Sequence, residues 1–285
     1  MRLRRGKRRS AEVPTVLRSS RTALVATLLC AAGLVATVLA VRFLAPVQAR
    51  DVLAFDSFRR LDGPTSSGPL RLIASVGDPL LYVVLGLTAA AVAWARGRQR
   101  IALAIPVLLL ATGATTQVLK VVLDEGTLKP GSFPSGHATA ALPLALCAAL
   151  AAPARLRPAV IAAGAGLAAA VSYAIVSLGW HSPSDILGGF LVAATLTGAA
   201  GVVLLRGEER RGETPPPRTA AARGDLWVPA LATVAGVGAA AVLTSSLRGV
   251  GLAAGVQAHT TATAAAAAIA ALAATLLVVF ARIAR

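Results

Sequence analysis

Long apolar runs constrain the fold of this chain more than any other feature of its sequence. Stretches of about 20 apolar residues recur along its 285 residues, and a helix of that length spans a hydrocarbon core about 30 Å thick. Hydrophobic residues make up 56% of the chain, and its mean hydropathy of +0.73 is too high for a water-soluble globule. The sequence therefore predicts an integral membrane protein.

The predicted spans are helical, because lipid offers no hydrogen-bond partner to exposed backbone groups and the strict alternation of a transmembrane barrel is missing. The fold class that we predict is all-α, a polytopic transmembrane helix bundle. Eight spans are expected, at about 22–45, 69–95, 101–123, 138–154, 158–178, 185–205, 227–246 and 260–281.

Composition shifts divide the chain into four predicted parts. A basic cytoplasmic tail at 1–21 precedes a membrane domain of six spans at 22–205. A cytoplasmic linker at 206–226 contains five arginines and three consecutive prolines. The last part, 227–285, is a membrane hairpin of two helices.

The N-terminus raises the question of a cleaved signal peptide. A basic region precedes an apolar run, and Val47-Gln48-Ala49 resembles a cleavage site. The run from Thr22 to Ala45 is, however, longer than a typical signal core. A retained signal anchor is the preferred interpretation, and cleavage is the alternative.

Basic residues predict the topology. The formal net charge is +16, and six of the first nine residues are Lys or Arg. With the N-terminus inside, 20 Lys or Arg residues fall on the cytoplasmic side and seven on the outer side, as expected for cytoplasmic anchors. We predict a multi-pass protein of the cell (plasma) membrane with both termini cytoplasmic. Nucleic acid binding is not expected, because no basic domain interleaved with aromatic residues is present.

Two polar motifs lie at the ends of predicted spans. Pro-Ser-Gly-His occupies 134–137, and His-Ser-Pro-Ser-Asp occupies 181–185. The first motif follows three spans and the second follows five, so both are expected on the outer face at one membrane depth.

The two cysteines, Cys30 and Cys147, lie inside apolar runs and are interpreted as small core residues rather than a disulfide or a metal pair.

The residue types in these motifs suit the binding of an anion. Ser182 followed by proline is typical of a helix start. Asp185 lies four residues after His181, and its carboxylate could accept a hydrogen bond from one imidazole nitrogen and fix the tautomer. Ser135 and Gly136 offer a hydroxyl and backbone N–H groups. Lys120, near the outer end of its span, could direct its charge to the same face.

These motifs resemble those of the type 2 phosphatidic acid phosphatases (PAP2) and their haloperoxidase relatives. Residues 134–137 match the second motif of the family in full, and residues 181–185 match the later half of the third, His-x-x-x-Asp. The resemblance covers roughly residues 69–205 and implies a six-helix core. The first span and the last two lie outside that core or at its edge.

The resemblance also implies hydrolysis of a phosphomonoester or diphosphate without a metal or a cofactor. His181 would attack phosphorus to form a phosphohistidine, Asp185 would orient it, and His137 would protonate the leaving group. Ser135 and Gly136 would help to hold the phosphate.

Two parts of the family pattern differ in this chain. The third motif begins Ser-Arg in the family, and Ala174 and Ile175 stand at those places. The first motif reads Lys, six residues, Arg-Pro, but counting from Lys120 reaches Thr-Leu, and the nearest substitute is Lys129 with the proline after it. Arginine binds phosphate through a fork of donors that lysine cannot reproduce. Lys120 and Lys129 remain as the predicted phosphate-binding cations.

The first hypothesis is a phosphatase or phosphotransferase acting at the outer membrane face. Its substrate would be a lipid phosphate such as phosphatidic acid, phosphatidylglycerol phosphate or a polyprenyl (di)phosphate. A catalytically weak or inactive protein that binds lipid headgroups or partners is one alternative. A transporter is another, less favoured because Lys120 is almost the only ionisable residue deep in the spans.

His259 lacks a motif and is interpreted as an interfacial residue. Richness in Ala, Arg and Gly suggests a bacterial source, and the sequence does not indicate an oligomeric state.

Overall fold

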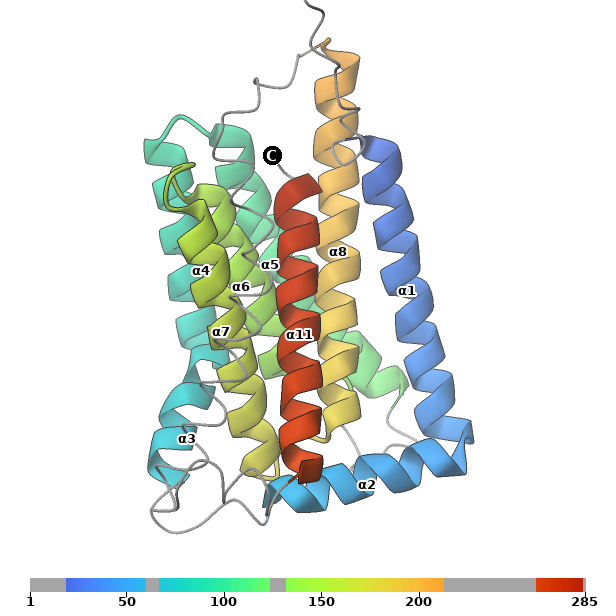
Figure 1. The fold of residues 1–285 in the computed structure, drawn as a ribbon. Helices are drawn as coiled ribbons and strands as arrows, with labels where there is room; N and C mark the ends of the chain where they lie inside the picture. The colour runs from blue at the N-terminus through green and yellow to red at the C-terminus, as the bar shows by residue number, and fades with distance from the viewer. Residues whose placement is uncertain (1–18, 60–66, 124–131, 213–259, 284–285) are drawn as a thin grey trace, which may run out of the picture.

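The computed structural model describes residues 19–59, 67–123, 132–212 and 260–283. Within these residues the secondary structure is helical and no strand occurs, which confirms the predicted all-α class. Most of the helices run roughly side by side as a bundle (Figure 1). They are α1 (Ser20–Phe43), α4 (Pro79–Ala95), α5 (Gln99–Val122), α6 (Gly136–Ala151), α7 (Arg157–Ser177), α8 (Pro183–Arg210) and α11 (Thr260–Ile283).

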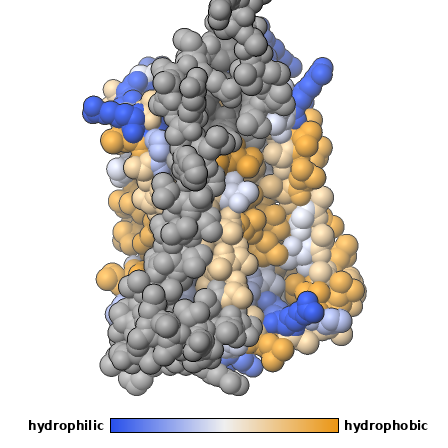
Figure 2. Space-filling model, viewed as in Figure 1, coloured by the Kyte–Doolittle hydropathy of each residue, from blue (hydrophilic) through white to orange (hydrophobic). Residues whose placement is uncertain are grey.

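The helices agree with a polytopic membrane protein. Four described helices are long and apolar enough to cross a membrane, namely α1, α5, α7 and α8. The number of such spans is five if one bent helix pair is counted as a single span. Two further apolar helices are shorter, at Gly136–Ala151 and Ala264–Phe280. Where Figure 2 shows the described residues, apolar residues predominate beside the middle of the bundle, and hydrophilic residues lie mainly towards its two ends. The predicted span at 227–246 lies outside the described residues.

The predicted span at 69–95 is not one straight helix. It consists of α3 (Ser67–Ala74), the 3-10 turn η1 (Ser75–Gly77) and α4, with a bend of 52°. Asp78 has an extended backbone with φ −67° and ψ 146°, and the following proline disfavours a helical conformation at this position. Asp78 lies at this break, inside the predicted span. The spans were expected to hold almost no ionisable residue besides Lys120, and Asp78 corrects that expectation.

The helix that contains the sixth predicted span runs beyond the predicted span end at 205. α8 continues to Arg210, through charged residues that favour a helix outside lipid. Glu209 in this extension binds the start of α1. Its Oε1 accepts the backbone N–H of Ser20 at 2.9 Å and its Oε2 accepts the Ser20 hydroxyl at 2.8 Å. The predicted linker therefore begins as helix, and its part after 212 lies outside the described residues.

The helix α2 (Ala45–Arg59), which the apolar spans did not predict, lies across the end of the bundle at which α1 ends (Figure 1). It is too polar to be a membrane span. Its buried residues Asp51, Ala54 and Phe58 recur at the spacing of one helix face. That spacing could have predicted the helix, but a search for long apolar runs does not detect it.

The core of the bundle lies where small residues let α6, α7 and α8 approach closely. A Cβ atom added to Gly164 of α7 would lie 2.6 Å from the Cβ atom of Ala145 in α6. Close approach through small residues is a common way for helices to associate in a membrane. Cys147 of α6 is fully buried in the cluster with α4 and α5, and Cys30 of α1 is half-buried.

Candidate active site

The two histidine motifs meet at one end of the bundle, where α6 and α8 begin. The ring centroids of His137 and His181 lie 6.3 Å apart. The two loops are joined by a backbone hydrogen bond, in which the N–H of Ser135 donates to the carbonyl oxygen of Asp185 at 2.9 Å. Segments more than 40 residues apart in the sequence are thus brought to one place.

Three glycines make this convergence possible. A Cβ atom on Gly188 would lie 2.4 Å from the ring of Phe133, and one on Gly189 would lie 2.7 Å from the carbonyl oxygen of Ser135. On the other side, a Cβ atom on Gly77 would lie 2.9 Å from the Cα atom of His137. The start of α6 is therefore held between α8 and the turn before α4, with no room for larger residues.

His181 is buried, with 8% of its surface exposed, and its Nδ1 atom lies 3.5 Å from Oδ2 of Asp185. This contact has the distance of an ion pair, but Nδ1 has no hydrogen-bond partner. The carboxylate of Asp185 instead accepts the backbone N–H of Ser182 at 2.9 Å, as part of a capping box at the start of α8. The helix start predicted at Ser182 is confirmed, and the predicted hydrogen bond from His181 to Asp185 is not formed.

His137 contacts a carboxylate that the sequence analysis did not select. Its Nε2 atom lies 3.3 Å from Oδ1 of Asp78, and the two side chains are 23% and 53% exposed. Asp78 stands just before α4, so the bend between η1 and α4 directs it to the start of α6. An acidic residue next to a proline inside an apolar stretch was the signal in the sequence. Each histidine of the pair therefore has its own carboxylate.

Comparison with known families agrees with this geometry. A family model described as the PAP2 superfamily matches residues 112–206, which contain both histidine motifs. The matched region, called the PAP2 region below, is about a third of the chain. No curated protein matches the chain, and no solved structure does. This similarity to the PAP2 superfamily suggests phosphatase chemistry on phosphate esters.

Of the predicted phosphate-binding residues in the PAP2 region, Ser135 and Gly136 lie at the start of α6. Ser135 is fully buried, and its Oγ atom accepts the backbone N–H of Ala138 at 3.3 Å. Its hydroxyl thus caps the helix. Gly136 has open space beside its backbone, because an added Cβ atom would meet nothing within 4 Å. The partly exposed backbone of Gly136 and the helix N-terminus are the features here that suit an anion.

The two predicted lysines differ in what the structure shows. Lys120 lies in the last turn of α5, half-buried, and its charge acts on the imidazole of His137. Lys129 lies outside the described residues. Ala174 and Ile175, at the places of the Ser-Arg pair of the PAP2 pattern, are both fully buried in α7. The Ile175 carbonyl oxygen accepts the backbone N–H of Trp180 at 2.9 Å, so this position belongs to the core and to the turn before His181.

Two arginines outside the PAP2 region lie beside that turn. The guanidinium carbon of Arg71 lies 5.9 Å from the ring centroid of Trp180, and the Trp180 and His137 rings are 5.5 Å apart. A Cβ atom on Gly179 would lie 3.4 Å from Nε of Arg59. The sequence analysis counted both arginines only as outer basic residues. Among the described residues, no group of three His, Cys, Asp or Glu side chains has an arrangement that could hold a metal ion.

Proposed function

We propose that this chain is a membrane-bound phosphatase that hydrolyses a phosphomonoester or diphosphate of a lipid through a phosphohistidine. The observation that carries the proposal is the pair of imidazoles, 6.3 Å apart at one end of an apolar bundle, each with a carboxylate beside it. A phosphoryl group placed between two such rings has a nucleophile on one side and a proton donor on the other.

In the first step, His181 attacks phosphorus through Nε2, because Nδ1 faces Asp185. A nitrogen–phosphorus bond forms while the bond from phosphorus to the lipid oxygen breaks. The protonated His137 transfers its proton to that oxygen, and the lipid leaves as an alcohol or, from a diphosphate, as a monophosphate. Asp185 stabilises the positive charge that develops on the imidazole of His181.

In the second step, water attacks the phosphohistidine. The now neutral His137 accepts a proton from that water, the nitrogen–phosphorus bond breaks, and inorganic phosphate leaves with His181 regenerated. The start of α6 favours the anion through its N–H groups and its helix dipole. Lys120 adds a positive charge near His137, and Arg71 beside Trp180 supplies a guanidinium group in place of the one missing at Ile175.

A lipid phosphate is the substrate class that suits this position. The histidines lie at the end of a membrane bundle, where a phosphate headgroup reaches protein while its hydrocarbon chains remain in lipid. Phosphatidic acid, phosphatidylglycerol phosphate and polyprenyl phosphates or diphosphates all have this shape. The distribution of basic residues supports an extracytoplasmic position for this end, at the cell membrane.

The proposal is tested with the full chain purified in detergent. Phosphate release is measured from these three lipid classes and from a water-soluble phosphomonoester, each with and without a metal chelator. We expect release from at least one lipid, unchanged by the chelator. Absence of release from every lipid would contradict the proposal.

Asp78 gives a prediction specific to this chain. Asp78→Asn should lower kcat about ten- to a hundredfold, less than the 10²–10⁴ that a general acid itself contributes, because the amide cannot stabilise protonated His137 as a carboxylate does. Loss of the Asp78 carboxylate lowers the pKa of His137. In the pH–rate profile, the decrease in rate at alkaline pH should therefore begin at a lower pH. The measurement is a pH–rate profile, with Asp56→Asn on the exposed side of α2 as the matched control. An unchanged profile would show that Asp78 plays no part.

A second candidate function is the binding of lipid headgroups without turnover. The buried isoleucine at 175 favours it, because the structure has no guanidinium group at that place. Lipid binding by a chain that releases no phosphate, with affinity unchanged by His181→Ala, would support this alternative.

A further inference from the structure

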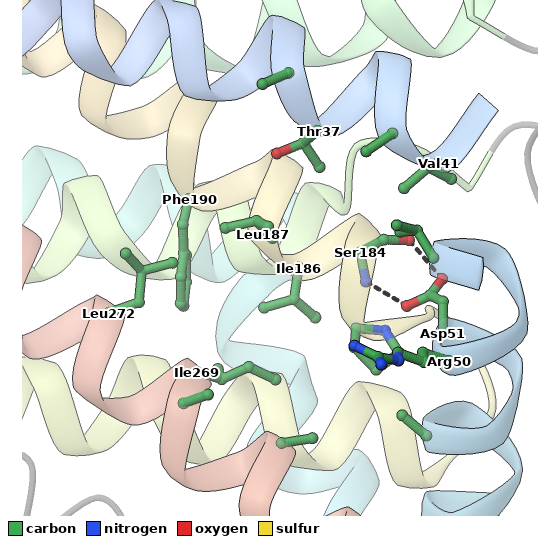
Figure 3. Close-up of a pocket in the computed structure, with 17 residues that line it drawn as sticks. Thr37, Val41, Arg50, Asp51, Ser184, Ile186, Leu187, Phe190, Ile269 and Leu272 are labelled. Atoms are coloured by element: carbon green, nitrogen blue, oxygen red, sulfur yellow. Dashed lines mark hydrogen bonds between the residues drawn. The ribbon is translucent and has the colours of Figure 1, made fainter. Parts of the chain in front are cut away.

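A groove lies on the face of α8 that points away from the histidine pair. It has a volume of about 630 Å³, and its walls come from α1, α2, α8 and α11. Ser184, Leu187 and Phe190 of α8 line it (Figure 3). These residues recur at helical spacing on one face, whereas Gly188 and Gly189 on the opposite face contact the loop before α6. The groove and the candidate active site thus share the start of α8 from opposite sides.

One end of the groove is polar. The Asp51 carboxylate accepts the backbone N–H of Ser184 at 2.9 Å and its hydroxyl at 2.6 Å. Figure 3 shows Asp51 and Arg50 together at this end. Asp51 is 8% exposed, and burial raises the pKa of its carboxyl group, although the hydrogen bonds from Ser184 oppose this. Arg50 is exposed, so its guanidinium group is the charge that a ligand in the groove can reach.

The rest of the groove is apolar. It lies between α1 and α8, which are long and apolar enough to cross a membrane, and the shorter apolar helix α11. Its walls carry Val41 of α1, Phe190 of α8, and Ile269 and Leu272 of α11. Alanines on α1 and α11 leave the space between these side chains open. A volume of this size is typical of ligand sites, which measure about 300–1,000 Å³. Hydrocarbon is the ligand chemistry that the bilayer supplies at such a surface.

We propose that this groove binds one hydrocarbon chain of an anionic phospholipid, whose phosphate pairs with Arg50. The apolar walls accept the chain and the exposed guanidinium group accepts the headgroup. Asp51 does not oppose the phosphate strongly, because its carboxylate is turned towards Ser184 and hydrogen-bonded there. Ser184 also bonds Ser182 through the two hydroxyls at 2.8 Å, so the lipid would lie next to the cap that carries Asp185. This site does not depend on the proposed phosphatase activity.

The test is photocrosslinking of the full chain in liposomes. The probe is phosphatidylglycerol with a diazirine in one acyl chain, and labelled peptides are identified by mass spectrometry. We expect label on the groove faces of α1, α8 and α11. Ala268→Trp on one wall, and independently Ala36→Trp on the other, should lower this labelling at least about fivefold by filling the groove. Ala114→Trp, at an exposed position of α5, is the matched control and should leave the labelling unchanged.

A second arm tests the headgroup. Phosphatidylcholine with the same diazirine chain should label the groove several-fold less than phosphatidylglycerol, and Arg50→Gln should remove that difference. Label spread evenly over all lipid-facing helices, or groove labelling that survives both tryptophan variants, would overturn the site. Equal labelling by the two lipids in the unchanged chain would overturn the role of Arg50.

Discussion

Replacing His181 by alanine is expected to lower phosphate release from the lipid substrate by on the order of a thousandfold or more. Alanine has no nitrogen that can form a bond to phosphorus, so the covalent route is lost completely. His137 and the start of α6 would still bind the phosphate, and the affinity for the lipid should therefore fall much less than kcat. Initial rates of phosphate release at saturating lipid, together with a direct binding measurement, separate the two effects.

The chain supplies its own matched control for this variant. His259 is the third histidine and has no motif around it, so His259→Ala should leave the rate within about twofold. His137→Ala should have an intermediate effect of about 10²–10⁴-fold, the range of a lost general acid. Equal release by the unchanged protein and the His181→Ala variant would remove the nucleophile from the mechanism.

Adding a single methyl group at Gly189 is expected to lower kcat about tenfold to a hundredfold. The new Cβ atom of Gly189→Ala would lie 2.7 Å from the carbonyl oxygen of Ser135 and 2.9 Å from Oγ1 of Thr139. Both atoms belong to the start of α6. The Ser135 carbonyl oxygen is a backbone atom and cannot move aside as a flexible side chain does, so His137 shifts relative to His181. A displacement of about 1 Å at a reacting centre costs roughly a hundredfold in rate.

The same substitution elsewhere in the bundle controls for helix propensity. Gly166→Ala in α7 places its Cβ atom where nothing lies within 4 Å, and it should leave activity nearly unchanged and raise stability slightly through helix propensity. Gly189→Ala should in addition lower the free energy of unfolding by about 1–3 kcal/mol, the usual cost of overpacking. Activity and thermal unfolding of both variants in detergent provide the comparison. Full activity of Gly189→Ala would mean that the approach of α6 to α8 does not position the histidines.

The apolar spans could be predicted from the sequence because each depends on a local property, a run of residues long enough to cross lipid. The break at Asp78 and the helix α2 are different. The break depends on one proline and one acidic residue inside an apolar stretch, and a hydropathy average conceals both. α2 depends on a buried face of only three residues, including Asp51, which a search for apolar runs rejects.

In the candidate site too, a local sequence pattern reveals some residues, whereas others are brought in only by packing. His137 and His181 were predictable because their motifs are contiguous and the number of spans before each places both on one side. Asp78 and Arg71 come from a segment about 60 residues or more before His137, and only the three-dimensional packing of η1 against α6 brings Asp78 to its ring. The carboxylate of Asp185 was correctly placed near His181, but the sequence did not show that the cap of α8 would take its hydrogen bond.

The most direct test of the two-histidine mechanism is to trap the covalent intermediate. The full chain is mixed with lipid phosphate labelled in the transferable phosphoryl group, quenched in alkali within the first turnover, and digested for peptide mapping. We predict one phosphoryl group per active chain, labile to acid and attached to His181, and none in the His181→Ala variant. Label on another residue, or phosphate release with no label on His181 at any quench time, would contradict the mechanism.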